Sequence, residues 1–414
     1  MEHTEAEEFV PQRGTNLLRM GDYNQRVVID AVRRAGGKMS RVALSKATGL
    51  SAQTVSNICR RLIDQGVIAE SGKESSRPGK PRTLLELNAD SLYAIGVHVD
   101  PVQMTFVLLD VFGRTVARST KRLPATAVPR TTLAAIGEAV AKLMSSSGID
   151  AGRVAGIGVA APGPIDLVRG LIIDPPQLSA WHAVPLRQML ADITGLPVFL
   201  EKDTRAAALA ELWAGASSSF VLFYFGSGLG AGIAIHGEAL GGVSGNAGEI
   251  GHIIVDPDGP RCVCGLRGCL GATSMPEHLV AEAERRGVMT GIREGRDPRS
   301  VAESLQTLCD RADEGDEAGQ AILREAAERV AIGTSVLVNL LDVGTVICGG
   351  PFWDRLQPHY LPTLRTVLPA HLVAHDIHSV TVEGTSLGKD IAAIGAGCLV
   401  LHETLSPTAG VLQK

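Results

Sequence analysis

The chain contains 414 residues, of which 45% are hydrophobic, 20% are charged and 4% are aromatic. This composition excludes a fibrous or largely disordered protein and predicts two or three compact units, each with its own core. No apolar run reaches the about 20 residues of a membrane-spanning helix, and the N-terminus is acidic. We therefore expect a cytoplasmic protein with neither a membrane partner nor a secretory signal peptide.

The formal net charge of −5 is unevenly distributed along the chain. Residues 1–12 contain four Glu and no Lys or Arg, which predicts an acidic tail over residues 1–14. Residues 13–82 contain 14 Lys or Arg against five Asp or Glu, and the remainder of the chain is acidic. A basic segment joined to an acidic body predicts a polyanionic partner that binds at one end.

Residues 15–88 have the pattern of a small helical domain that ends in two strands. An apolar face at Val27–Val32 predicts a first helix, Ser40 is placed to begin a second, and Thr48-Gly49-Leu50 ends it. Ser51 can cap a third helix. Two short helices joined by a glycine turn form a helix-turn-helix, whose second helix enters the major groove of DNA.

The helix predicted at residues 51–65 has a polar face that suits DNA. Its apolar face would bury Val55, Ile58 and Leu62. The amides on the opposite face can read adenine, and the guanidinium groups can reach phosphate or guanine. The predicted DNA contacts of this helix are Ser51, Gln53, Thr54, Ser56, Asn57, Arg60 and Arg61.

Two alternating stretches at residues 67–70 and 83–87 predict paired strands with a basic loop between them. The segment RPGKPR at residues 77–82 is narrow, stiff and cationic, which suits insertion beside a phosphate or into a minor groove. Its predicted DNA contacts are Arg77, Lys80 and Arg82. The alternative is a small helical domain whose cations are only solvated. Cap, glycine turn, polar face and basic loop together favour a winged helix-turn-helix that binds double-stranded DNA.

From Tyr93 onward, β-rich and helical stretches alternate. The predicted strands lie at residues 94–99, 105–110, 154–159, 197–200 and 220–225. The predicted helices lie at residues 131–147, 185–194 and 204–214. This alternation predicts an α/β body at residues 89–414 in which helices pack on sheets.

Motifs in this body resemble those of the ROK (repressor, open reading frame, kinase) family. They are APGPID at 161–166, QLSAW at 177–181, GLPVFLEKDTRAAALAE at 195–211, GSGLGAG at 226–232 and AGEIGHIIVDPDGPRCVCGLRGCL at 247–270. The family comprises bacterial repressors and sugar kinases with a two-lobed, actin-like and ribonuclease-H-like fold. The resemblance covers residues 15–400 and implies one lobe at about 89–200 with the C-terminal end and another at about 201–385. A winged helix in front is the arrangement of the family's repressors.

The seven cysteines are an odd number, which argues against a disulfide framework. His252, Cys262, Cys264 and Cys269 match the family's zinc ligands, and a closed set of three thiolates and one imidazole is typical of a structural zinc site. The alternative is a redox pair, which usually has two residues between its cysteines, whereas Cys262 and Cys264 have one. The resemblance therefore implies zinc as a structural cofactor.

The resemblance also raises an alternative function, an ATP-dependent sugar kinase that carries a DNA-binding module. The family's first phosphate loop has the pattern D-x-G-G-T, and the register places His98 at its Asp and Asp100-Pro101-Val102 at its Gly-Gly-Thr. Proline removes an amide donor, and Asp100 brings negative charge towards a triphosphate. We therefore predict a catalytically inactive body, although Gly226–Gly228 and Cys348–Gly350 keep the family's second phosphate and adenosine positions.

The family's sugar pocket has changed in this chain. Asp203 falls on the catalytic base, here vestigial, and Glu249 and His252 fall on sugar contacts. The substituted positions are Lys202 and Arg205 in place of two asparagines, Ala180 in place of a glycine and Gly271 in place of a glutamate. Two new cations favour an anionic ligand such as a sugar phosphate or a sugar acid. The alternatives are that Lys202 pairs with Asp203 or Glu201, that Arg205 lies on a solvated helix face, or that the pocket has lost its ligand.

Taken together, these patterns predict a homodimeric or homotetrameric transcriptional regulator, most simply a repressor of carbohydrate-related genes. Two copies would read a palindromic operator, because the recognition helices of a dimer lie one turn of DNA apart. A sugar or anionic sugar derivative that changes this spacing would release the DNA. The remaining alternatives are the sugar kinase and a purely structural or interaction protein.

Overall fold

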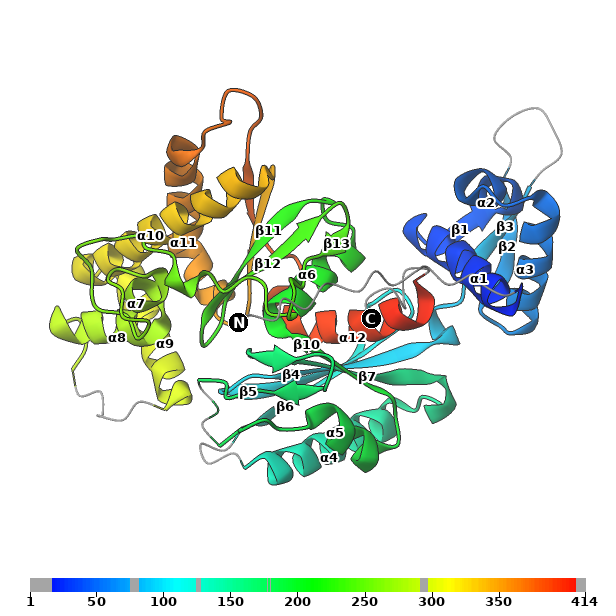
Figure 1. Cartoon of the computed structure of the whole chain (residues 1–414), viewed down its shortest axis with the longest axis horizontal. Coiled ribbons are helices and arrows are strands. Elements are labelled where there is room, and N and C mark those ends of the chain that lie inside the picture. The colour runs from blue at the N-terminus through cyan, green and yellow to red at the C-terminus, as the bar shows by residue number, and fades with distance from the viewer. Residues whose placement is uncertain are drawn as a thin grey trace, which may run out of the picture. The chain divides into compact units, whose positions relative to one another are not determined.

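The computed structural model describes residues 17–74, 82–123, 128–176, 178, 180–290 and 297–406 (Figure 1). The described residues divide into two compact units, the first made of residues up to Asn88 together with residues 403–406, and the second of residues 89–402. The predicted acidic tail and the tip of the predicted wing lie outside the described residues. A search of the described residues found no helix with the length and apolar character needed to cross a membrane.

The first unit contains three helices and an antiparallel sheet. The helices are α1 (Leu17–Arg34), α2 (Arg41–Thr48) and α3 (Ala52–Asp64). The strands β1 (Lys38–Ser40), β2 (Ile68–Glu74) and β3 (Arg82–Leu87) pair in the order β1-β3-β2. Helices α2 and α3 are those predicted, and β2 and β3 confirm the predicted hairpin. Strand β1 has only three residues, which is too short for a recognisable alternation of apolar and polar residues.

Local side-chain chemistry sets the ends of α2 and α3. The Ser40 hydroxyl accepts a hydrogen bond from the Ala43 amide (3.3 Å), and the Ser51 hydroxyl accepts one from the Thr54 amide (3.1 Å). Gly49 ends α2 with a φ of +70°, a backbone conformation that glycine adopts without strain. The predicted caps and turn are therefore confirmed.

The buried face of α3 differs from the prediction by one residue. Val55, Cys59 and Leu62 are fully buried, whereas Ile58 is half-buried. Cys59 behaves as a small apolar residue and keeps the spacing of three to four positions that an amphipathic helix needs.

The second unit contains two lobes, each built on one sheet. The first lobe has the sheet β10-β7-β4-β5-β6, with antiparallel pairing of β4, β5 and β6 and parallel pairing of β4, β7 and β10. Its strands are β4 (Tyr93–Val99), β5 (Gln103–Leu109), β6 (Thr115–Arg122), β7 (Val154–Ala161) and β10 (Val198–Lys202). Helices α4 (Pro129–Ser147) and α5 (Leu186–Thr194) cover one face of this sheet (Figure 1).

The second lobe has the sheet β13-β12-β11-β14-β15. Its strands are β11 (Phe220–Phe225), β12 (Leu229–Ile235), β13 (Glu238–Ala239), β14 (Thr345–Gly349) and β15 (Thr381–Gly384). The helices that share its core are α7 (Leu270–Ser274), α8 (Pro276–Arg285), α9 (Pro298–Asp313), α10 (Glu317–Leu341) and α11 (Trp353–Val367). The predicted α/β fold class is confirmed.

Helices α6 (Asp203–Ala214) and α12 (Ile391–Leu405) pack between the two sheets. Their backbones approach closely at Gly395, where a Cβ atom would lie 1.7 Å from the Ala206 carbonyl oxygen. Gly158 of β7 makes a similar approach to α12, because a Cβ there would lie 1.8 Å from the Ala396 carbonyl oxygen. These contacts hold both lobes against one pair of helices, and α6 begins at the cleft between the lobes.

The smaller elements complete the second unit. The short strands are β8 (Ile165–Asp166) and β9 (Leu171–Ile172), and the 3-10 helices are η1 (Ala89–Ser91), η2 (Ala151–Arg153), η3 (Ile250–His252), η4 (Leu368–His371) and η5 (Gly388–Asp390). The hairpin β8–β9 follows the first lobe's strand β7, and η3 follows the loop after β13. Two residues of η3 line the cleft described below, as do Gly163 before the hairpin and Pro176 after it.

Candidate functional site

The exposed face of α3 carries the residues predicted to contact DNA. Ser51, Gln53, Asn57, Arg60 and Arg61 are exposed, whereas Thr54 and Ser56 are half-buried. The Gln53 amide nitrogen donates to the Asn57 side-chain oxygen (3.2 Å). The only acidic residue of α3 is Asp64 at its last position.

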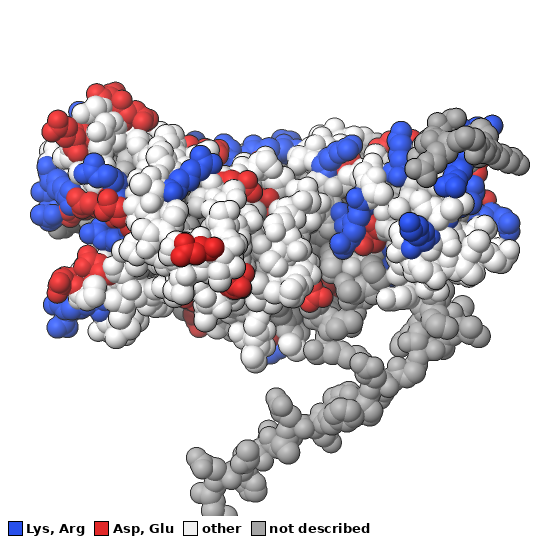
Figure 2. Space-filling view, turned by 90° about the horizontal axis from the view of Figure 1, so that it is seen from above, with Lys and Arg blue, Asp and Glu red and all other residues white. Residues whose placement is uncertain are grey.

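The charge around α3 suits a nucleic acid. Lys and Arg side chains are distributed over the visible face of the first unit (Figure 2). Arg82 is exposed at the start of β3, whereas Arg77 and Lys80 lie outside the described residues. A face of amides and guanidinium groups, on a helix whose one acidic residue is Asp64 at its end, can bind bases and phosphates together.

A cavity of about 450 Å³ lies in the second unit, between its two lobes. Its wall includes the end of β4, the start of α6, the turn between β11 and β12, and η3 with the loop that follows. The predicted ligand residues Lys202, Asp203, Glu249 and His252 all line it, and so does Gly271. These five residues are spread over 69 positions of the sequence, from Lys202 to Gly271, and meet at one cavity.

Asp203 is the first residue of α6, and its carboxylate accepts a hydrogen bond from the Thr204 amide (2.7 Å). Burial raises the pKa of Asp203 to about 7, and the nearby charge of Lys202 only partly offsets this effect. Asp100 and Glu249 add smaller contributions that also raise the pKa. Near neutral pH this group can therefore accept or donate a hydrogen bond to a ligand hydroxyl.

Lys202 lies at the end of β10 with its ammonium group buried. Its Nζ is 2.5 Å from Glu249 Oε1, 3.2 Å from the Ala247 carbonyl oxygen and 3.4 Å from the Asn246 carbonyl oxygen. The side chain of Lys202 is 4% exposed, whereas that of Glu249 is 60% exposed. Neither Asp203 nor Glu201 is the acidic partner of the ammonium group, so the predicted alternative pairing is wrong.

Arg205 does not face the cavity, so the prediction of a ligand-binding cation at this position is wrong. Its guanidinium group forms a buried ion pair with Glu201 and donates from Nε to the Ala239 carbonyl oxygen (3.0 Å). The side chains of Arg205 and Glu201 are only 10% and 2% exposed, so the solvated helix face is also excluded. The physical reason is that α6 turns this residue towards β13, away from the cleft.

A second cluster of functional side chains borders the same cavity. Ligand atoms of His252, Cys262, Cys264 and Cys269 all lie within 4.8 Å of one another. Cys262 Sγ is 3.5 Å from His252 Nδ1, and Cys264 Sγ is 3.6 Å from Cys269 Sγ. Gly268 permits the tight loop, because it has a φ of +65° and a Cβ there would lie 1.4 Å from the Asp256 carbonyl oxygen. These four residues could hold one metal ion.

Comparisons with known proteins agree with this geometry. A model described as the ROK family matches residues 94–403, and one described as winged helix-turn-helix DNA-binding matches residues 22–69. The chain belongs to the ROK family. The predicted family is therefore confirmed, as is the winged helix-turn-helix in front of the ROK body.

Three similar proteins represent the two kinds of ROK relative. A xylose repressor of Caldicellulosiruptor bescii is 27% identical over 380 residues, which are 89% of this chain and 93% of the relative. The structure of a ROK family transcriptional regulator, a homolog of E. coli MLC protein, has the same fold with a TM-score of 0.75 and 21% identity, over 95% of this chain and 99% of that one. A ROK glucokinase of Streptomyces griseus in complex with glucose and AMPPNP has a TM-score of 0.63 and 29% identity, over 74% of this chain and 98% of that one.

The turn after β4, at the position predicted to correspond to the family's first phosphate loop, is acidic. Strand β4 ends at Val99, and the Asp100 carboxylate accepts hydrogen bonds from the Val102 amide (2.8 Å) and the Ser227 hydroxyl (3.4 Å). Asp100 and Pro101 both line the cavity. His98 is buried against Tyr224, and burial lowers its pKa, so this ring is neutral at pH 7.

Gly271 and Ala180 are the other two positions at which the predicted pocket differs from that of the family. Gly271 lies in α7, and a Cβ there would be 3.1 Å from the Gly251 carbonyl oxygen and 3.3 Å from Met275 Sδ. A larger side chain at this position would require its neighbours to move. Trp181 is fully buried in the core of the first lobe, and neither it nor Ala180 is among the described residues that line the cavity.

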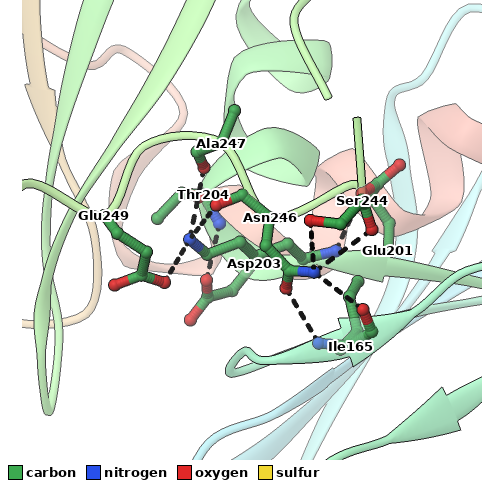
Figure 3. Close-up of polar contacts among 9 residues, drawn as sticks. Ile165, Glu201, Asp203, Thr204, Ser244, Asn246, Ala247 and Glu249 are labelled. Carbon is green, nitrogen blue, oxygen red and sulfur yellow. Dashed lines mark hydrogen bonds and ion pairs between the residues drawn. The ribbon is translucent and has the colours of Figure 1, made fainter. Parts of the chain in front are cut away.

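Sequence reasoning missed Asn246. Its side chain accepts from the Ile165 amide and donates to the Ile165 carbonyl oxygen, both at 2.8 Å, so it pairs with the backbone of β8 as a neighbouring strand would (Figure 3). Asn246 directly precedes the AGE segment of a ROK motif, but nothing in its local pattern indicates a partner 81 positions earlier.

Proposed function

We propose that this ROK protein is a DNA-binding transcriptional repressor of carbohydrate-related genes. The observation that carries this proposal is the capped helix α3, whose exposed face presents two amides and two guanidinium groups from a winged helix-turn-helix. The xylose repressor that matches 89% of the chain supports the same class of function. Its name indicates a sugar as the class of effector.

The DNA partner is a palindromic operator, and the protein binds it as a homodimer or homotetramer. One copy of α3 can read only one half-site, because a single recognition helix spans a few base pairs of the major groove. A second copy related by two-fold symmetry supplies the other half-site.

Operator binding should depend on Asn57 and Arg61. We expect Asn57→Ala to weaken binding to the DNA upstream of this gene by about 5- to 150-fold, because a base contact contributes about 1–3 kcal/mol. Arg61→Ala should reduce the salt dependence of the affinity, since it removes a phosphate contact. Fluorescence anisotropy at several salt concentrations measures both effects. Arg299→Ala in the second unit is the control, and an intact protein that binds without salt sensitivity would contradict the proposal.

The body binds an effector without phosphorylating it. The acidic turn at Asp100 and the neutral His98 argue against nucleotide binding at the first phosphate loop. The cavity beside Asp203 and Glu249 still offers carboxylate oxygens to sugar hydroxyls. The effector is therefore a sugar or a sugar derivative, and binding releases the operator if it favours a different spacing of the two recognition helices.

No phosphoryl transfer is expected from this protein. A coupled assay with ATP and a panel of sugars should show the same background rate for the natural chain and for Asp203→Ala. Turnover that disappears in Asp203→Ala would instead support the sugar kinase. That outcome would not contradict operator binding by α3, because fluorescence anisotropy measures DNA binding without ATP.

The metal of the cysteine cluster is zinc in a structural role. Three thiolates and one imidazole form the donor set that zinc prefers in closed sites, and four protein ligands leave no position for a reacting water. The cluster joins η3 to the start of α7, so a bound zinc ion would fix the part of the cavity wall that contains Gly271.

A further inference from the structure

We propose that Lys202 and Arg205 are positioning residues that hold the loop at residues 239–249, and that they make the cavity selective for a neutral, hydroxyl-rich ligand over an anionic one. The inference rests on the proposed effector function. The charges of Lys202 and Arg205 alone suggest that they contact a ligand. The inference is that they contact this loop instead.

Lys202 holds the end of the loop that reaches the cavity. An ammonium group has three protons to donate, and the structure provides three acceptors, one from each of Asn246, Ala247 and Glu249. Lys202 belongs to the sheet of the first lobe, whereas its three partners belong to a loop of the second lobe. The buried ammonium group therefore joins the two lobes beside the cavity and has no proton left for a ligand anion.

Arg205 holds the other end of the same loop. Its Nε donates to the carbonyl oxygen of Ala239, where β13 ends, and its guanidinium group lies beside Gly241. The charge of Arg205 is neutralised by Glu201, whose other carboxylate oxygen accepts the Lys202 amide at 2.9 Å. The buried Glu201 carboxylate thus links the Arg205 guanidinium group to the backbone of Lys202.

The loop between these two contacts is also supported by β12, because the Leu240 amide donates to the Ile233 carbonyl oxygen (2.8 Å) and the Gly248 carbonyl oxygen accepts from the Ala231 amide (2.9 Å). The Ala247 amide donates to the Gly241 carbonyl oxygen (3.1 Å), and the Asn246 side chain pairs with Ile165 of the first lobe. Gly163 packs closely on the same group, because a Cβ there would lie 3.4 Å from Lys202 Cε and 3.2 Å from Asn246 Oδ1. Loss of the Lys202 contacts would leave the Glu249 end of the loop attached to the first lobe only through Asn246 among these contacts, and to β12 through the Gly248 carbonyl oxygen.

The charge that remains in the cavity is unfavourable for an anion. Glu249 Oε1 accepts from Lys202, whereas the Glu249 side chain as a whole is 60% exposed. The other acidic groups of the wall are Asp100, Asp203 and Glu277, and the other side chain with a permanent positive charge is Arg261. Carboxylate oxygens accept hydrogen bonds from hydroxyl groups but repel phosphate and carboxylate groups. A neutral polyol therefore fits this wall better than its phosphorylated or oxidised form.

Binding of matched ligand pairs tests the selectivity. Calorimetric titration of the full chain would compare D-glucose, D-xylose and N-acetyl-D-glucosamine with glucose 6-phosphate, glucuronate and N-acetylglucosamine 6-phosphate. We expect a neutral sugar to bind at least ten-fold more tightly than its anionic counterpart. Tighter binding of an anionic member, lost in Lys202→Met, would overturn the proposal and make Lys202 a direct ligand contact. A chain that binds none of the six compounds would overturn the selectivity.

Hydrogen exchange tests the contacts with the loop without any ligand. Lys202→Met should raise the exchange rate of the Ala247 amide about ten-fold, Lys202→Arg should keep it near that of the natural chain, and Lys142→Met on exposed α4 is the matched control. An unchanged rate in Lys202→Met would overturn the positioning role. The exchange rate also distinguishes failure of this inference from failure of the proposed function. If the loop is protected but sugar does not release the operator, the repressor mechanism is contradicted and the positioning role still holds.

Discussion

Glu201→Gln is expected to lower the free energy of unfolding of the second unit by about 3–5 kcal/mol, because it leaves the buried Arg205 guanidinium without a charged partner. The side chains of the pair are 2% and 10% exposed, so water cannot replace the lost carboxylate. Urea denaturation followed by circular dichroism would measure the shift in the midpoint of the transition.

Two variants make this test specific. Arg299 and Glu303 form an ion pair with the same spacing of four residues, but their side chains are 51% and 66% exposed. Glu303→Gln should therefore change stability by less than about 1 kcal/mol. Replacing both buried partners, as in the double variant Glu201→Leu with Arg205→Leu, should restore much of the loss, since no uncompensated charge remains. Equal shifts for Glu201→Gln and Glu303→Gln would contradict the buried pair.

Removal of the metal is expected to have the other large effect. Structural zinc contributes about 10–16 kcal/mol of binding free energy in zinc-finger peptides, and that energy is available only to the folded site. Chelation of the purified protein should lower the midpoint of thermal unfolding and release about one zinc ion per chain. It should also weaken effector binding, because His252 and Gly271 line the cavity.

Substitution of single cysteines would distinguish the effect of losing the metal from the effect of disturbing the core. Cys264→Ser should abolish zinc binding with little loss of packing, because Cys264 is exposed. Cys309→Ala should keep the zinc while it destabilises the core of the second lobe, because Cys309 is fully buried away from the cluster. Metal content measured by atomic emission distinguishes the two. A purified chain that holds no zinc, with an unfolding midpoint that does not respond to chelator, would contradict the proposed cofactor.

The elements that the sequence predicted well depend on neighbouring residues. Ser40 and Ser51 cap helices because their hydroxyl groups reach amides three residues later, and Gly49 ends α2 through its own backbone conformation. The cysteine cluster was predicted from a motif that places three thiols within eight positions. The α/β alternation of the body followed from runs of apolar residues, and the ROK motifs identified its family.

The amino-acid sequence by itself determined the winged helix-turn-helix, the composition of the histidine and cysteine cluster, the ROK fold and the positions that depart from the family's pocket. Only the tertiary structure decided what Lys202 and Arg205 do. Their partners Glu249 and Ala239 lie 47 and 34 positions away, so no local pattern records them. A cation in a sequence predicts an anion nearby, but the fold decides whether that anion is a ligand or a carboxylate of the protein. In this chain both cations have protein carboxylates as partners, because α6 and β10 place them against the loop beside the cavity.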